Sequence, residues 1–569
     1  MPVTHGVTGS SPVHTAQSAA LKGTFCITGV LVQLVRIHAC HAWGHGFESR
    51  THRKRFRKFN AFGSVLLYKH IDTATKLKPP FTMITFIICL CALVIGYLFY
   101  GRYVERVFGP DDRPTPATLK ADGIDYVAMP YWKIFMIQFL NIAGTGPIFG
   151  AIMGAKFGPV AYLWIIFGCV FAGAVHDYLS GMLSLRNDGR DLPSLVRKYL
   201  GRATSGVLLV FTVLLLVMVG IVFVYSPAEI LGSMAGSKVM WMVIIFAYYI
   251  VATMLPIDKI IGKVYPLFSF SLLFMAVALV VMLFIKMPAL PELWDGLGNM
   301  GKLTNPGTFS SDIFPALFIT IACGAISGFH ATQSPLMARC MASERKGRPI
   351  FYGAMITEGV VALVWATVSM WFFYDAPQPG YAQIPEAAAT GYATSAPMVV
   401  QLVCNNWLGV AGGILAMLGV VAAPITSGDT ALRSARLIIA QALKFNQKPI
   451  ANRLYICVPL FVVSFLALEW QINNPDGFNT IWQYFGWANQ TLSIFTLWTV
   501  TVYLTLHHKP YVLTLVPAVF MSAVCTSFLV VSKNALGLPT TVGYAVAAGV
   551  AVFALVCFFV WKRKLAKAA

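Results

Sequence analysis

Long apolar runs dominate the chain from Met83 onward, and short polar stretches separate them. A helix needs about 20 apolar residues to cross the roughly 30 Å hydrocarbon core of a bilayer. The pattern therefore predicts an all-α integral membrane protein with about 13 transmembrane helices. The spans are expected near residues 84–100, 132–153, 159–185, 207–228, 239–256, 264–286, 312–335, 351–373, 407–432, 453–469, 481–504, 510–531 and 542–561.

Basic residues between the runs test this number of spans, because cytoplasmic loops collect Lys and Arg. After Met83, alternate loops and the C-terminal end hold 25 Lys and Arg, whereas the intervening loops hold 5. A wrong number of spans would scramble such an alternation. It predicts a cytoplasmic C-terminus and an external loop at 374–406.

Composition fits a lipid environment and narrows the function classes. Of 569 residues, 57% are hydrophobic and 11% are charged, against about 25% charged in soluble domains. The chain has no HExxH, GxSxG or GxxxxGK[ST] motif, so we expect neither an enzyme nor direct use of ATP. Its 11 cysteines show no metal-binding spacing. We expect no metal, no organic cofactor and no nucleic-acid partner.

Residues 1–82 differ from the rest, with 11 Lys and Arg against two acidic residues and no spanning run. Preceding an external Met83, this basic stretch would break the charge rule. The stretches GVTGSSPVHT and AWGHGFESR also look like out-of-frame translation of transfer-RNA genes. We expect the natural start at Met83 and a polytopic domain over 83–569. A disordered basic tail or a targeting peptide are the alternatives.

Two sets of five predicted spans form an internal repeat, at about 132–286 and 312–504, and the peripheral helices 84–100, 510–531 and 542–561 lie outside it. Because five is odd, the second set is inverted relative to the first. Each set opens with a glycine-rich interruption, NIAGTGP at 141–147 and GAISGFHATQSP at 324–335. Interrupted helices in matching positions of inverted repeats are typical of a binding site near the membrane midplane.

The backbone explains why such interruptions bind ligands. Pro147 has no N–H and crowds the carbonyl group of Ala143, and unpaired backbone groups cannot face lipid. Freed N–H groups attract an anion and freed carbonyl groups attract a cation. Close helix packing or a simple kink is the alternative. The predicted substrate-binding residues are Asn141, Gly144, Thr145, Gly146, Ser327, Gly328 and His330.

At these residues the chain resembles the carbon starvation protein A family of bacterial inner-membrane transporters. The matching stretches are DGIDYV (122–127), NIAGTGPIFGAIMGAKFG (141–158), GAVHDYLSGMLSLRNDGRDL (173–192), YSPAEILGS (225–233), GAISGFHATQSPLMARCMASERKGRPIFYGAMITEG (324–359) and APITSGDTALRSARLIIA (423–440). The resemblance implies uptake of peptides or pyruvate in starvation, in a fold similar to the amino acid–polyamine–organocation superfamily. His176 departs from the longer members, which leaves the substrate open.

Ionisable residues inside predicted spans are costly, so each needs a partner or a cavity. The candidates for ion or proton coupling are His176, Asp177, Glu358, Thr426, Ser427 and Asp429. They would carry H⁺ or bind Na⁺; structural hydrogen bonding to neighbouring helices is the alternative.

These observations together predict an ion-coupled secondary transporter that imports a small carboxylate, a peptide or pyruvate. No Arg lies in the middle of a predicted span, so we expect half-helix N-termini to hold the carboxylate. A nutrient sensor or receptor, or a channel, is the alternative function.

Overall fold

The computed structural model describes residues 83–121, 126–254, 257–295, 313–374, 379–388, 390–391, 394–445, 449–474 and 477–568. The chain divides into two units, Met1–Pro79 and Pro80–Ala569. The segment 1–82, with its predicted start site, lies outside the described residues. Within those ranges the chain forms helices, turns and irregular segments, without a strand.

The first half of the described chain forms helices of very different lengths. They are α3 (Ile84–Ile95), η1 (Gly96–Tyr100), α4 (Gly101–Phe108), α5 (Pro116–Leu119), α6 (Tyr131–Ile142), α7 (Gly146–Ala155), α8 (Val160–Phe167), η2 (Gly168–Gly173), α9 (Ala174–Arg186), α10 (Leu192–Tyr199), α11 (Arg202–Met234), α12 (Lys238–Met254), α13 (Ile257–Lys286) and η3 (Leu293–Asp295).

The second half contains the longest helix, α18. Its elements are α14 (Ile313–Thr320), α15 (His330–Ala338), η4 (Glu344–Lys346), η5 (Arg348–Tyr352), α16 (Gly353–Tyr374), η6 (Gly380–Gln383), α17 (Pro385–Ala388), α18 (Ala396–Ala442), α19 (Ile450–Asn473), α20 (Gly477–Leu506), α21 (Val512–Val531) and α22 (Thr540–Ala568).

Nine spans among the described residues are long and apolar enough to cross a membrane, and the bent pair α6 and α7 makes a tenth. Each coincides with one of the predicted spans. The three remaining predicted spans fall on α12, on the α14 and α15 pair, and on α20. The all-helical polytopic class is therefore confirmed, while the number of 13 stays a prediction.

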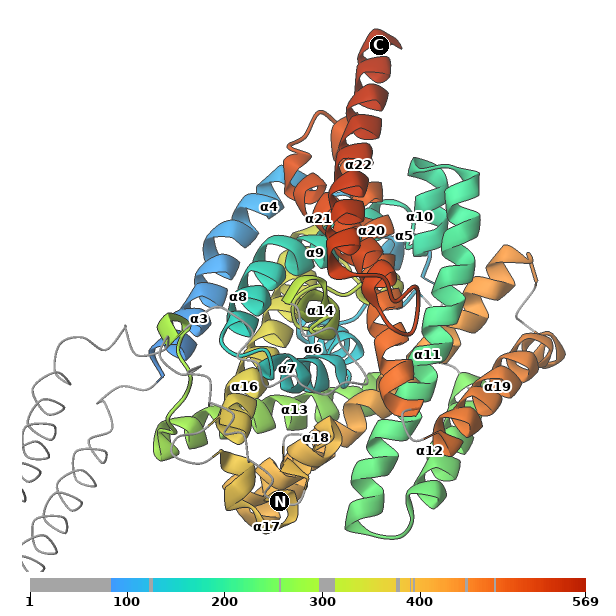
Figure 1. Ribbon diagram of the computed structural model, residues 1–569. Helices are drawn as coiled ribbons and strands as arrows, with labels where there is room; N and C mark the ends of the chain where they lie inside the picture. The colour runs from blue at the N-terminus through green and yellow to red at the C-terminus, as the bar shows by residue number, and fades with distance from the viewer. Residues whose placement is uncertain are drawn as a thin grey trace, which may run out of the picture. The chain divides into compact units, whose positions relative to one another are not determined.

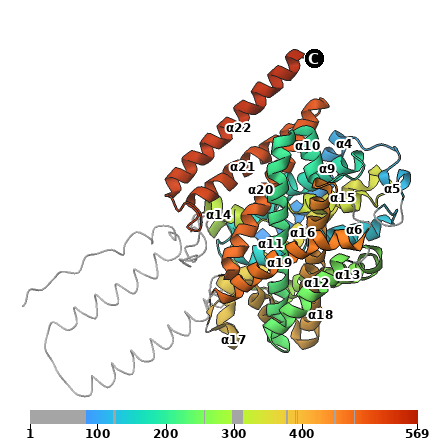
Figure 2. The ribbon, with the colours of Figure 1, turned by 90° about the vertical axis from the view of Figure 1, so that its right-hand side faces the viewer.

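Burial separates central helices from peripheral ones. The span Glu344–Tyr374 is 89% buried within its apolar window, whereas Thr540–Lys567 is 17% buried and Ile84–Phe108 is 33% buried. α22 lies along the edge of the bundle beside α21 in Figure 2, and its C-terminal end projects beyond the other helices in Figure 1. The central helices also carry the ionisable residues, since only protein contacts can satisfy those groups in a bilayer.

Both predicted helix interruptions are present. α6 and α7 meet at an angle of 47° across residues 143–145. Between α14 and α15, residues 321–329 leave the helix, and Gly324 adopts a φ of 90° that favours glycine. The interruptions touch, because a Cβ atom at Gly146 would lie 2.3 Å from Cys323 Sγ.

Polar contacts between helix ends and loops fall into two sets. One set joins loops predicted to be cytoplasmic, through the pairs Arg186–Glu344, Arg345–Asp112, Lys120–Asp188, Lys509–Phe108 and Gln441–Ser194. The other joins loops predicted to be external, through the pairs Thr85–Glu292, Ser395–Glu229, Tyr374–Lys156 and Tyr484–Asn534.

Candidate functional site

A fully buried cluster of ionisable side chains lies where α9, α15 and α16 meet. The carboxylate of Asp177 is hydrogen-bonded to two imidazole rings. His176 Nδ1 lies 2.7 Å from Oδ1, and His330 Nδ1 lies 2.7 Å from Oδ2. On the other side of the ring, His330 Nε2 lies 3.3 Å from Glu358 Oε2. All four side chains are 0% exposed. The structure thus joins four residues that the sequence analysis placed in three separate spans.

Glycines allow these helices to come so close. A Cβ atom at Gly173, just before α9, would lie 2.2 Å from the carbonyl oxygen of Ala325 in the second interruption. One at Gly359, beside Glu358, would lie 2.5 Å from Cys169 Sγ. Small residues at helix interfaces are the usual way in which membrane helices approach each other.

The proton count in the cluster is constrained. An ionised Asp177 accepts hydrogen bonds from both Nδ1 atoms, so the neutral His330 presents a lone pair on Nε2 toward Glu358. That lone pair and an ionised Glu358 would repel each other. One proton must therefore be placed between His330 and Glu358, because uncompensated charge in an apolar interior is very costly.

Asn489 of α20 organises the second interruption and was missed in the sequence analysis. Its Oδ1 accepts from Phe329 N at 2.7 Å and from Ser327 Oγ at 3.1 Å, and its backbone oxygen accepts from Gly328 N at 3.2 Å. These bonds satisfy donors freed at the start of α15. The adjacent amides Asn489 and Gln490 inside a predicted span were the available signal.

The end of α6 and the first interruption carry buried polar atoms without hydrogen bonds inside the described part of the chain. They are the side-chain atoms Gln138 Oε1 and Nε2, Asn141 Oδ1 and Thr145 Oγ1. Native structures hydrogen-bond the large majority of such atoms, to protein or to a bound partner. Their position at the crossing is compatible with the predicted substrate site.

Predicted binding glycines face protein in this conformation. A Cβ at Gly144 would lie 2.7 Å from the Phe223 ring, and one at Gly328 would lie 2.3 Å from Ser493 N. Gly328 thus lets α20 approach the backbone. A larger residue there would push α20 away before it obstructed a ligand.

The predicted coupling residues of α18 form a second polar group. Ser427 Oγ donates to the carbonyl oxygen of Leu140 at 3.1 Å, which occupies a carbonyl group freed at the end of α6. Thr426 Oγ1 donates to the carbonyl oxygen of Ala423 at 2.8 Å. Asp429 lies 3.5 Å from Arg433 Nη2 and 3.5 Å from the hydroxyl of Tyr265. In the described residues, no ion pair or hydrogen bond links this group to the His330 cluster.

The position of Arg433 corrects the boundary of the ninth predicted span, on which the expected absence of Arg within the spans depended. The predicted ninth span ended at residue 432, so Arg433 counted as a loop residue. In the structure α18 continues to Ala442, and Arg433 is 2% exposed. It donates to the carbonyl oxygen of Ala252 at 2.5 Å and pairs with Asp429. A guanidinium is therefore buried in a spanning helix, and the carboxylate of Asp429 already pairs with it.

A third arrangement has ligands suited to a metal ion. Cys323 Sγ, His330 and Glu358 offer ligand atoms that lie within 4.8 Å of one another, and all three residues are buried. No sequence spacing indicated this trio, because Cys323 lies in the irregular segment, His330 begins α15 and Glu358 comes from α16. The expectation of no metal site therefore rested on spacing alone.

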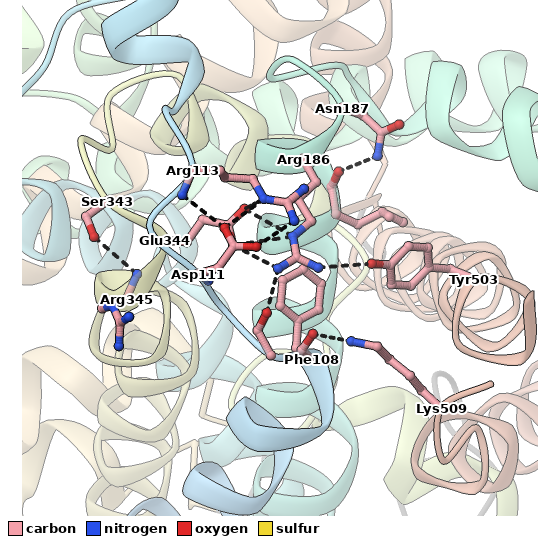
Figure 3. A network of polar contacts seen from close by, with 12 residues as sticks. Phe108, Asp111, Arg113, Arg186, Asn187, Ser343, Glu344, Arg345, Tyr503 and Lys509 are labelled. Carbon is pink, nitrogen blue, oxygen red and sulfur yellow. Dashed lines mark hydrogen bonds and ion pairs between the residues drawn. The ribbon is translucent and has the colours of Figure 1, made fainter. Parts of the chain in front are cut away.

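A further polar network joins the ends of several helices (Figure 3). Glu344 lies 2.9 Å from Arg186 Nη2, whose guanidinium also reaches the carbonyl oxygen of Gly109 and the hydroxyl of Tyr503. The hydrogen bonds from Arg113 hold the pKa of Asp111 well below its usual range. The network ties the ends of α4, α9 and α20 to η4.

Two interrupted helices that cross inside a polytopic bundle, beside buried ionisable side chains, define a membrane transporter. The chain belongs to the carbon starvation protein CstA family, whose model matches residues 81–233, 224–389 and 382–528.

Relatives agree with this class. An uncharacterized membrane protein of Haemophilus influenzae is 46% identical over 52% of this chain and 92% of its own length. The peptide transporter CstA of Campylobacter jejuni is 27% identical over 76% of this chain and 77% of its own length. The pyruvate/proton symporter BtsT of Escherichia coli is 27% identical over 50% of this chain and 49% of its own length.

Solved structures support the fold. The chain resembles a manganese transporter of Eremococcus coleocola with a TM-score of 0.50, at 13% identity, over 78% of this chain and 98% of that chain. At that identity the likeness concerns the fold alone.

Proposed function

We propose that this chain is a proton-coupled secondary transporter that imports a peptide or pyruvate across the bacterial inner membrane during starvation. The observation that carries the proposal is the buried cluster in which His330, the first residue of α15, lies between Asp177 and Glu358. The relatives named as a peptide transporter and as a pyruvate/proton symporter support the two substrate classes.

Charge explains how this cluster would couple substrate to protons. With Asp177 and Glu358 ionised and His330 protonated, the cluster carries one net negative charge, and one further proton makes it neutral. A carboxylate substrate brings another negative charge toward the same region. Desolvating unbalanced charge is expensive. The substrate-loaded transporter and the empty transporter would therefore favour different numbers of protons bound to the cluster.

Sodium coupling at Thr426, Ser427 and Asp429 is less favoured by the geometry. Both hydroxyl groups already donate to backbone carbonyl groups, and Asp429 lies beside the Arg433 guanidinium. A sodium ion would have to share that carboxylate with a buried positive charge.

The substrate would lie at the crossing of the two interruptions, among Asn141, Thr145, Gly146, Ser327 and His330. The buried atoms Asn141 Oδ1 and Thr145 Oγ1 support this place, since each makes no hydrogen bond among the described residues. The N-terminus of α7 adds about half a positive charge toward a carboxylate.

The proposal includes 13 spans, an inverted repeat of five and five, and a cytoplasmic C-terminus. The two sets of loop contacts support this topology, because every pair named above joins loops on the same predicted side.

Reconstitution in proteoliposomes tests the function. Labelled pyruvate and labelled di- and tripeptides are supplied outside, with and without an inward proton gradient, and with a sodium gradient in a separate series. We expect accumulation of one substrate class, driven by the proton gradient and abolished by a protonophore. Facilitated entry that no gradient accelerates would contradict coupled transport, and sodium-driven accumulation would move the coupling site to α18.

A further inference from the structure

A thiol, an imidazole and a carboxylate converge at the crossing of the interrupted helices. We propose that Cys323, His330 and Glu358 bind a zinc-class divalent ion, and that the bound ion holds the transporter in one conformation. The inference rests on the proposed function only for its transport readout, since metal binding is measured directly.

The separation of the ligand atoms fits such an ion. Zinc bonds of about 2.0–2.1 Å to nitrogen and oxygen at a tetrahedral angle place those two atoms about 3.3 Å apart. His330 Nε2 and Glu358 Oε2 are 3.3 Å apart. The three ligand atoms lie within 4.8 Å of one another, so Cys323 Sγ must approach by about 1 Å, which a modest turn about χ1 provides.

The nitrogen and carboxylate atoms that would face the ion are poorly hydrogen-bonded. His330 Nε2 and both carboxylate oxygens of Glu358 are buried and make no well-formed hydrogen bond within the ranges that the structure describes. Buried polar atoms of this kind call for a bound ion, a water or another explanation. Here His330 Nε2 and Glu358 Oε2 lie 3.3 Å apart, and the ligand atoms of the trio, with Cys323 Sγ, lie within 4.8 Å of one another.

Outer contacts orient two of the ligands, as they do in established metal sites. Asp177 Oδ2 lies 2.7 Å from His330 Nδ1 and so directs the lone pair of Nε2 toward Glu358. Asn489 Nδ2 lies 3.4 Å from Cys323 Sγ, close enough to donate to a thiolate. Gly146 leaves room for the sulfur atom, since a Cβ there would lie 2.3 Å from it.

The ligand set selects the kind of ion. Thiolate and imidazole suit Zn²⁺ and related transition ions, whereas Na⁺, Mg²⁺ and Ca²⁺ require oxygen ligands. A Zn²⁺ ion with the Cys323 thiolate and the Glu358 carboxylate is neutral in charge, and two protons leave to solvent, the thiol proton and the proton shared by His330 and Glu358. Three protein ligands leave a fourth position for a water molecule or a carboxylate.

Binding would have a mechanical consequence. Cys323 lies in the irregular segment before α15 and His330 is the first residue of α15, while Glu358 belongs to α16. A bound ion would fasten that segment and the start of α15 to α16. Transport by alternating access requires such elements to move against each other, so the ion would inhibit uptake.

Direct binding is the first experiment. Purified protein freed of metal by a chelator is titrated with Zn²⁺ by calorimetry, and with Co²⁺ while thiolate-to-metal absorption is recorded. We expect one ion per chain and a charge-transfer band in the wild type. Cys323→Ser should lose the band and bind zinc at least about tenfold more weakly, and Glu358→Gln should also weaken binding. Cys404→Ser, at another fully buried cysteine, should match the wild type.

Uptake is the second experiment. Zinc should inhibit uptake by the wild type and by Cys404→Ser, whereas Cys323→Ser should transport in chelator and resist zinc. Absence of zinc binding in the wild type, or equal binding by Cys323→Ser, would overturn the site. Binding without inhibition would overturn the conformational part. If no substrate were transported under any condition, the proposed function would fail while the binding result still decided the metal site.

Discussion

At the scale of residues, the site depends on charges that only neighbouring helices can balance. Asp177 holds two imidazoles in orientation and has no exposed surface. A neutral amide at this position would keep one acceptor oxygen but remove the charge that fixes His330.

We expect Asp177→Asn to reduce uptake driven by a proton gradient by at least about 100-fold, in the range found when positioned acid–base groups are removed. The measurement is initial uptake in proteoliposomes at matched protein density. Glu292→Gln is the control, because Glu292 is also buried and accepts from the backbone N–H groups of Ile84 and Thr85, outside the cluster. Unchanged gradient-driven uptake in Asp177→Asn would exclude the cluster from coupling.

Asp429 and Arg433 present a different case, a buried ion pair outside the His330 cluster. Removing one member of such a pair leaves the other charge uncompensated, which costs about 3–5 kcal/mol. We expect Asp429→Ala to lower the free energy of unfolding by about 3 kcal/mol, measured in detergent. The double variant Asp429→Asn with Arg433→Gln should recover much of that loss.

Transport by the Asp429 variants then separates structure from coupling. If the double variant folds and keeps proton-driven uptake, the pair serves stability. If it folds but loses accumulation against a gradient, the coupling ion binds at α18 instead of at the His330 cluster.

At the scale of elements, glycine decides how the interrupted helices cross. Gly146 at the start of α7 faces Cys323, and Gly150 one turn later faces the carbonyl oxygen of Thr320, 2.9 Å from a Cβ placed there. Both contacts would be lost if α7 carried larger side chains, because the backbone of the second interruption could not move without breaking its bonds to Asn489.

We predict that Gly146→Ala lowers the free energy of unfolding by about 1–3 kcal/mol, the usual cost of overpacking, and reduces uptake. Gly206→Ala in α11 is a matched control, because no atom lies within 4 Å of its added Cβ. Alanine is also the better helix former there, by up to about 1 kcal/mol. Equal stability of the two variants would contradict the tight crossing.

At the scale of the whole molecule, the distribution of Lys and Arg among the loops agrees with the polar contacts between loops. Loops that the Lys and Arg distribution places inside are joined through Glu344, Arg186 and their neighbours (Figure 3). Burial, followed by the nearby guanidinium of Arg186, lowers the pKa of Lys509 in this network. Clustered basic side chains at one end are typical of a cytoplasmic face.

We predict that a reporter fused at the C-terminus shows a cytoplasmic location. A cysteine introduced at Glu386 should react with a membrane-impermeant reagent added from outside. The expectation follows from five predicted spans between the loop 374–406 and the C-terminus. A cysteine at Asp112, in a loop of the opposite set, is the control that should react only after permeabilisation. Labelling of both positions from one side would contradict the number of spans.

The sequence by itself determined the polytopic helical class, the positions of the described spans and the two interruptions. These are local properties: a run of apolar residues, a proline without an N–H and a glycine with a positive φ act within one segment. The family was also readable, because its motifs are continuous stretches of sequence.

Only the tertiary structure decided which polar residues meet. His176, Asp177, His330 and Glu358 share a cluster, whereas Asp429 pairs with Arg433, whose burial the hydropathy pattern did not show. The trio with Cys323 was equally unreadable, and the adjacent amides Asn489 and Gln490 did not show which groups they bind. Contacts between distant helices depend on which faces turn toward each other and how closely glycines let them approach, and no local pattern along the chain contains that information.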